Sequence, residues 1–107
     1  MVRHGDIIVL DLDPQAGHEQ KGRRPAVVIS NDLFNRYSRM FMICPITHTD
    51  KRHPFHIPLD DRTETKGVVL CDQARILDVK ARNYGFVERL PTELLDKVKN
   101  LVISFIE

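Results

Sequence analysis

The segment between Gly17 and Pro25 holds most of the side-chain types that acid–base chemistry on a charged substrate needs. An imidazole, a carboxylate, an amide and three cationic groups fall within it: His18, Glu19, Gln20, Lys21, Arg23 and Arg24. Gly17 and Gly22 let the backbone approach a ligand closely. The segment is therefore a candidate site, and the alternative is a solvated connecting loop.

RNA is a substrate that such groups can cleave without a metal ion. Attack by the neighbouring 2′-hydroxyl needs a base, a cation or hydroxyl donor for the non-bridging phosphate oxygens, and an acid for the leaving 5′-oxygen. Five residues supply these types: His18, Glu19, Arg24, Thr47 and Asp72. We therefore expect no cofactor.

Each of these residues also has an ordinary structural explanation. Arg24 suits a surface ion pair, Glu19 a solvated loop, and Thr47 a strand with good β propensity. Asp72 interrupts the apolar run that begins at Val68. A carboxylate there either finds a partner, as functional groups do, or points to solvent from an alternating strand.

Residues that commonly bind metals follow no recognised ligand pattern here. Cys44 and Cys71 lie inside apolar runs, which favours reduced core side chains over a disulfide or a zinc site. The spacing H-x4-H-x2-H of His48, His53 and His56 matches no common zinc motif and has no evident carboxylate partner. The sequence therefore predicts no metal site.

The net charge of +1 conceals a clustered distribution of basic groups. They gather in three segments: Lys21, Arg23 and Arg24; Arg36 and Arg39; and His48, Lys51, Arg52 and His53. If the three segments converge, they form a surface that attracts phosphates. Taken singly, each cluster is a typical solubilising surface.

Length and composition indicate one globular domain over residues 1–107. The chain is 42% hydrophobic and 29% charged, which is ordinary for a soluble protein. No apolar run approaches the roughly 20 residues of a membrane helix, and residues 1–6 lack the features of a signal peptide. We expect a cytoplasmic protein without membrane contact.

Hydrophobic periodicity predicts an α+β architecture: a small twisted antiparallel sheet or barrel closed by an amphipathic helix. We expect strands at 6–13, 25–30, 40–47, 55–59, 68–78 (one strand, or two joined at 73–74) and 85–88. We also expect a helical turn at 31–35, capped by an Asn or Asp side chain at its start. Pro45 implies an edge strand or a bulge. From Pro91 onward an apolar stripe predicts a helix packed on the sheet: Leu94, Leu95, Val98, Leu101, Val102, Phe105 and Ile106.

Seven ordered motifs resemble the MazF/PemK/Kid family of toxin endoribonucleases across nearly the whole chain. They are Gly5-Asp6, Asp13-Pro14, Gly17-His18-Glu19-Gln20, Arg24-Pro25, Pro45-Ile46-Thr47, Gly67-Val68-Val69 and Cys71-Asp72-Gln73. Residues 71–82 resemble the Kid/PemK branch most closely. The resemblance implies an SH3-like β-barrel with helices and a homodimer that is the toxin of a type II toxin–antitoxin pair. It also implies metal-independent cutting of single-stranded messenger RNA at short sequences, which leaves 2′,3′-cyclic phosphate and 5′-hydroxyl ends, and inhibition by the flexible acidic tail of an antitoxin.

The resemblance assigns roles by position. Arg24 would stabilise the pentavalent phosphate and Thr47 would donate its hydroxyl to it. Glu19 matches an acidic residue of the MazF branch, whereas Asp72 matches the proposed base of the Kid branch, with His18 assisting. The chain departs from the Kid branch at Leu70, where that branch has an arginine proposed as general acid, and at position 48, where His48 replaces a small polar residue.

Base selection is expected from the variable loops. Phe55 or Phe34 would stack on a base, unless both are core residues, and Arg52, His53 or Gln73 would read base edges. Gln20, Lys21, Arg23, His48 and Lys51 complete the predicted RNA-binding set. Two other functions stay open: a toxin of the same fold that inhibits DNA gyrase, and, because of Leu70, an RNA-binding module without catalysis.

Overall fold

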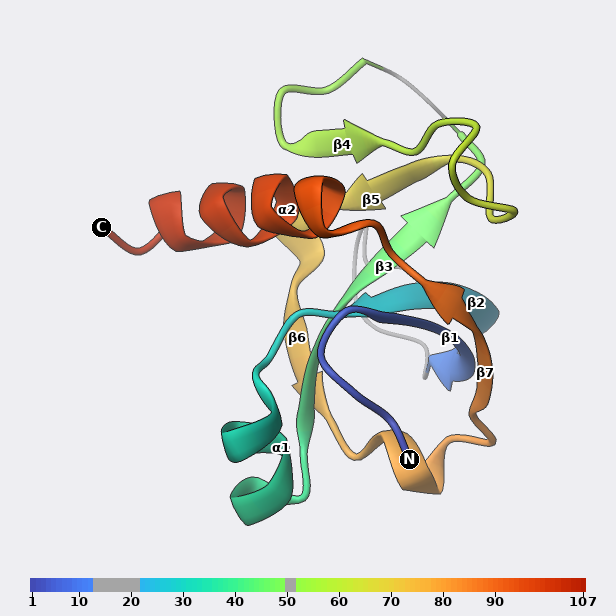
Figure 1. Cartoon of the computed structure of the whole chain (residues 1–107), viewed down its shortest axis with the longest axis vertical. Coiled ribbons are helices and arrows are strands. Elements are labelled where there is room, and N and C mark those ends of the chain that lie inside the picture. Colours follow the sequence, from blue (N-terminus) through green and yellow to red (C-terminus); the bar gives the residue numbers. More distant parts are fainter. Residues whose placement is uncertain (13–21, 50–51) are drawn as a thin grey trace.

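An antiparallel sheet of seven strands forms the body of the molecule, and helices cover and connect it (Figure 1). The computed structural model describes residues 1–12, 22–49 and 52–107. In chain order the elements are β1 (Asp6–Leu12), β2 (Gly22–Val28), α1 (Asp32–Ser38), β3 (Phe41–Thr47), β4 (His56–Pro58), β5 (Val68–Leu70), η1 (Cys71–Gln73), β6 (Arg75–Leu77), η2 (Val79–Ala81), β7 (Gly85–Arg89) and α2 (Thr92–Ser104). The α+β class is confirmed.

Strand β3 lies in the middle of this sheet, in the order β4-β5-β3-β2-β1-β7, with β6 pairing β3 separately. The pairing forms an open path, because β4 and β7 are its two ends among the described strands. Figure 1 shows β6 beside the start of β3 and β5 beside its end. The strand that contains Pro45 is therefore central, and its expected edge position is wrong.

The change of neighbour along β3 explains how a central strand accommodates proline. On one side, β6 pairs with Phe41 to Ile43, and β5 pairs with Ile46 and Thr47. Pro45 falls between the two ladders, where a missing N–H costs no strand pairing on that side. On the other side, the β2 register runs through Pro45 without a shift.

Alternating side chains bury both faces of the central strands. One cluster packs against α2 and contains Ile7, Val27, Ile29, Cys44, Ile46, Val69, Cys71, Leu90, Leu94, Leu95, Val98 and Val102. The other contains Val2, Ile8, Leu10, Leu12, Ala26, Val28, Phe41, Ile43, Leu77 and Val79. This double burial makes the sheet a rigid frame for side chains at the strand ends.

Helix α2 follows Pro91 as the periodicity predicts, but its apolar stripe ends earlier than expected. The helix stops at Ser104, so Phe105 and Ile106 leave the helical period and are 41% and 81% exposed. Their predicted burial is wrong. Within the described part of the chain, no helix combines the length and apolar character needed to cross a membrane.

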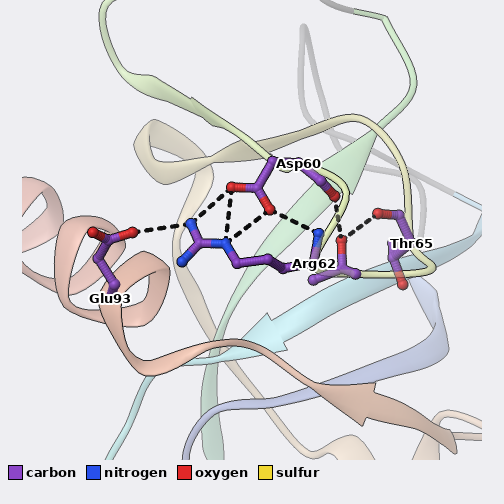
Figure 2. Close-up of polar contacts among 5 residues, drawn as sticks. Asp60, Arg62, Thr65 and Glu93 are labelled. Atoms are coloured by element: carbon purple, nitrogen blue, oxygen red, sulfur yellow. Dashed lines mark hydrogen bonds and ion pairs between the residues drawn. The ribbon is translucent and has the colours of Figure 1, made fainter.

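The turn between β4 and β5 is tied to the first turn of α2. Figure 2 shows the Arg62 guanidinium between Asp60, at 2.7 Å, and Glu93, at 2.9 Å. Hydrogen bonds from Arg62 lower the pKa of Asp60 to about 2. The Thr63 hydroxyl donates to the Thr65 carbonyl at 2.7 Å. These contacts order the turn that leads into β5.

Three boundaries differ from the sequence expectation. Strand β2 already begins at Gly22, so Arg23 and Arg24 are strand residues instead of loop residues. Helix α1 is longer than one turn, and its predicted cap is confirmed, because the Asn31 side chain accepts from the Phe34 N–H at 2.8 Å. The expected long strand divides into β5 and β6, joined by the 3-10 helix η1.

Candidate functional site

Arg24 and Thr47 lie on one face of the sheet on neighbouring strands. The β2–β3 ladder ends at the pair Ala26–Pro45, and Arg24 and Thr47 each lie two residues beyond this pair, on the same side of their strands. Both side chains are half-buried. A guanidinium and a hydroxyl donor thus follow the last pair of two core strands on one face.

Gly67 allows β5 to begin directly against Thr47. Its φ is +119°, and a Cβ at this position would lie 2.0 Å from the carbonyl oxygen of Thr47. The next residue, Val68, pairs with Thr47 in the β3–β5 ladder. Only glycine fits such an approach, so the position of the Thr47 backbone depends on Gly67.

Asp72 lies in contact with His56. The Nε2 atom of His56 lies 3.3 Å from Oδ1 of Asp72, and the two side chains are 16% and 35% exposed. Asp72 belongs to η1, directly after β5, instead of an alternating strand. Of the two interpretations left open for this carboxylate, the partnered one therefore agrees with the structure.

The two pairs share one face of the sheet through β5. Val68 pairs with Thr47 on β3, and Leu70 pairs with His56 on β4. Because residues two apart in a strand point to the same side, Thr47 and His56 flank β5 on the same face. Strand β5 separates them, so the Cα atoms of Thr47 and His56 are two strand spacings apart across the sheet. Their partners on β5 also differ by two residues along the strand, which gives a Cα–Cα distance of roughly 12 Å in a flat sheet.

Aromatic rings border the His56–Asp72 pair. The His53 ring stacks on His56 with 4.5 Å between centroids, and Phe55 lies 5.3 Å from His53 and 4.9 Å edge-on from Phe105. Phe55 is 41% exposed and Phe34 is 38% exposed, so neither is a fully buried core residue. His53 and Phe55 therefore offer ring faces beside the pair, whereas Phe34 belongs to α1.

The structure does not bring every predicted residue to this face. Arg23 alternates to the opposite side of β2 from Arg24, where its Nη1 lies 3.2 Å from Asp11 and 2.6 Å from the Asn83 carbonyl. His48 and Arg52 are exposed after β3, and Gln73 is half-buried in η1. The remaining predicted residues lie outside the described part of the chain: His18, Glu19, Gln20, Lys21 and Lys51.

The histidines do have a nearby carboxylate, contrary to the expectation from the sequence. Ligand atoms of His53, His56 and Asp72 lie within 4.8 Å of one another. However, His53 Nδ1 accepts from the Phe55 N–H at 3.1 Å, and His56 Nε2 faces the Asp72 carboxylate. One of these nitrogens already accepts a hydrogen bond, and the other already has the carboxylate as its neighbour. We therefore assign these contacts to the protein itself and assign no cation to the group.

His56 is the site residue that sequence reasoning missed, because it considered His56 only as a metal ligand. One signal was available, since a histidine at position 56 alternates with Ile57 in the expected half-buried strand. The sequence does not predict that this strand pairs with β5, so it does not predict the contact between His56 and Asp72 either.

The two cysteines lie near this site but are inert. Both are free and buried, as predicted. The hydrogen bond with Cys71, together with burial, raises the pKa of the Cys44 thiol far above its usual range. A neutral buried thiol is no nucleophile, so covalent thiol chemistry is not part of the site.

Two surface hollows, of about 280 and 260 Å³, lie elsewhere. The first includes Asp6 and Arg89, and the second includes His4 and Lys99. Neither is lined by Arg24, Thr47, His56 or Asp72.

Residues 3–106 match the model of a protein family described as the PemK-like, MazF-like toxin of type II toxin–antitoxin systems. The chain belongs to this family, as the sequence motifs indicate.

Individual relatives agree. The endoribonuclease PemK of Escherichia coli is 38% identical over 91% of this chain and 76% of its own length. The endoribonuclease EndoA of Bacillus subtilis is 36% identical over 92% of this chain and 88% of its own length. A crystal structure of MazF from Deinococcus radiodurans superposes with a TM-score of 0.90 at 35% identity, over 98% of this chain and 96% of that one. A crystal structure of a MazE–MazF complex from the same organism superposes with a TM-score of 0.85 at 35% identity, over 98% of this chain and 95% of that one.

Proposed function

We propose that this member of the toxin endoribonuclease family cuts single-stranded messenger RNA at short specific sequences and needs no metal ion. The observation that carries the proposal is the register of β2 and β3, which puts Arg24 and Thr47 on one face, each two residues beyond the pair Ala26–Pro45. A guanidinium and a hydroxyl in this arrangement can hold the two non-bridging oxygens of one phosphodiester.

The reaction is an in-line transfer within the RNA. A base takes the proton of the 2′-hydroxyl, the 2′-oxygen bonds to the adjacent phosphorus, and the bond from phosphorus to the 5′-oxygen breaks. The leaving oxygen receives a proton, so the products carry a 2′,3′-cyclic phosphate and a 5′-hydroxyl. Arg24 and Thr47 stabilise the charge that develops on the phosphate, and Arg24 is also a candidate acid. Asp72 is the candidate base among the described residues.

Glu19 and His18 stay alternatives for the base and its assistant. The exposed ring of Phe55, beside His53, would stack on an unpaired base. Arg52, Gln73 and His48 would contact base edges and phosphates. Three further predicted contacts, Gln20, Lys21 and Lys51, belong to the same RNA-binding set.

The proposed partners are a second copy of the chain and an antitoxin. Solved relatives include MazE–MazF complexes, which supports an antitoxin partner here. Its acidic tail would imitate RNA phosphates against the basic groups of the site, and would therefore compete with RNA. A competition assay with an acidic antitoxin peptide tests this, and sedimentation showing only monomer at micromolar concentration would contradict the dimer.

Cleavage of a labelled single-stranded RNA in EDTA tests the chemistry. We expect Arg24→Ala and Thr47→Ala each to lower kcat by about 10²-fold or more. The matched control is Arg23→Ala, which removes the adjacent arginine from the opposite face and should change kcat by less than about threefold.

An RNA with a 2′-deoxy sugar at the cut position should resist cleavage completely. Near-normal kcat in the Arg24 or Thr47 variant removes that residue from the mechanism. Inhibition of gyrase supercoiling without RNA cleavage would support the competing toxin function instead.

A further inference from the structure

We propose that His56 is the positioning residue for Asp72 and that it holds this carboxylate from β4, the strand that faces position 70. The inference rests on the proposed ribonuclease function. The resemblance to the Kid/PemK branch puts an arginine at position 70, two residues before the carboxylate, and this chain has Leu70 there. The place beside Asp72 is nevertheless occupied by another basic side chain.

The sheet register explains how His56 reaches the space beside Asp72. His56 is the direct cross-strand partner of Leu70 in the β4–β5 ladder. Directly opposite residues have Cβ atoms about 4.5–5.5 Å apart, so a side chain at 56 and one at 70 reach the same space. His56 uses that space to bring its Nε2 within 3.3 Å of Oδ1 of Asp72.

The surroundings hold the imidazole in this orientation. Its side chain is only 16% exposed, and the His53 ring covers it at 4.5 Å. His53 is itself fixed, because its Nδ1 accepts from the Phe55 N–H. The Nδ1 of His56 is buried and has no hydrogen-bond partner among the described residues. The contact with Asp72 is thus the polar interaction that orients His56.

This contact prepares Asp72 for proton transfer. A polar contact at Oδ1 holds the carboxylate in one rotamer, and Oδ2 is then the oxygen that accepts the proton of the RNA 2′-hydroxyl. Leu70 is 2% exposed and brings no charge to this step. His56 therefore acts on the RNA through Asp72 and not by direct contact.

Single-turnover and steady-state cleavage by His56→Ala, with the wild type in parallel, tests this role. We expect kcat to fall tenfold or more while KM stays within about threefold, and the melting temperature separates this loss from unfolding. His56→Gln keeps an N–H donor and should recover part of the rate. The matched control is His4→Gln, a histidine beside α1 whose loss should leave kcat unchanged. An unchanged kcat in His56→Ala, or a loss confined to KM, would overturn the inference.

A second variant tests the positioning role from the other strand. Leu70→Arg in the His56→Ala background returns an N–H donor to the same space, and the smaller alanine leaves room for it. We expect the double variant to cleave at least fivefold faster than His56→Ala. A double variant that is no faster refutes the positioning of Asp72 by a donor at this place. Cleavage by the wild type tests the proposed function independently, because it does not depend on either variant.

Discussion

The Gly67→Ala substitution should damage both folding and the position of Thr47. The added Cβ would lie 2.0 Å from the Thr47 carbonyl oxygen and 2.8 Å from the carbonyl carbon, and both are backbone atoms. Comfortable contact needs about 3.4 Å or more, so the two strands must separate by more than about 1 Å. No side-chain rotation relieves this clash.

The magnitude follows from two contributions. A side chain at φ +119° strains the backbone by about 1–3 kcal/mol. Separating the start of β5 from Thr47 adds about 1–2 kcal/mol in weakened hydrogen bonds and packing. We expect a total loss of about 2–5 kcal/mol in the free energy of unfolding. A displacement of Thr47 by 1 Å should also lower RNA cleavage by about 10²-fold in the molecules that stay folded.

Gly22→Ala is the matched control. Gly22 also has a positive φ, +83°, but nothing lies within 4 Å of its would-be Cβ. It should therefore lose only the backbone contribution, about 1–2 kcal/mol. Urea unfolding of both variants, with cleavage measured well below the transition, makes the comparison. A Gly67→Ala protein as stable as Gly22→Ala would show that the β3–β5 approach is not as tight as the structure has it, and would refute the reasoning.

Three further substitutions test the frame around the site. Asp6 is 2% exposed and accepts from Arg89 at 2.9 Å, so Asp6→Ala should cost about 2–3 kcal/mol in urea unfolding, and a change below 0.5 kcal/mol would contradict this. Leu94 is 3% exposed between α2 and the sheet, so Leu94→Ala should cost about 2–4 kcal/mol, with thermal unfolding as the measurement. Burial and then Lys99 lower the pKa of His4 below 6.5. Because the unfolded chain then binds the proton more readily, stability should be complete above about pH 6.5 and fall as the pH drops through the lowered pKa; His4→Gln should flatten this slope.

Local signals in the sequence predicted most elements of the fold. The cap at Asn31, the period of α2 and the apolar strands were all readable, because each depends on residues close in the chain. Pro45 was misread for the opposite reason. A central strand tolerates this proline because β3 pairs with β6 before Pro45 and with β5 after it, and both partner strands lie far along the sequence. Phe105 and Ile106 were misread because periodicity alone cannot show that the helix ends at Ser104.

In the candidate site too, features that depend on nearby residues could be predicted, and features that depend on strand pairing could not. Arg24, Thr47 and Asp72 could be named from residue type and motif, since each has a recognisable local context. The strand register decides which of the predicted basic residues can act with them. A shift of one residue would exchange Arg23 and Arg24 between the two faces of β2. The same register sets His56 opposite Leu70, so the side chain beside Asp72 comes from the neighbouring strand. An inactive protein therefore does not follow from Leu70 alone, because the polar neighbours of Asp72 lie on more than one strand.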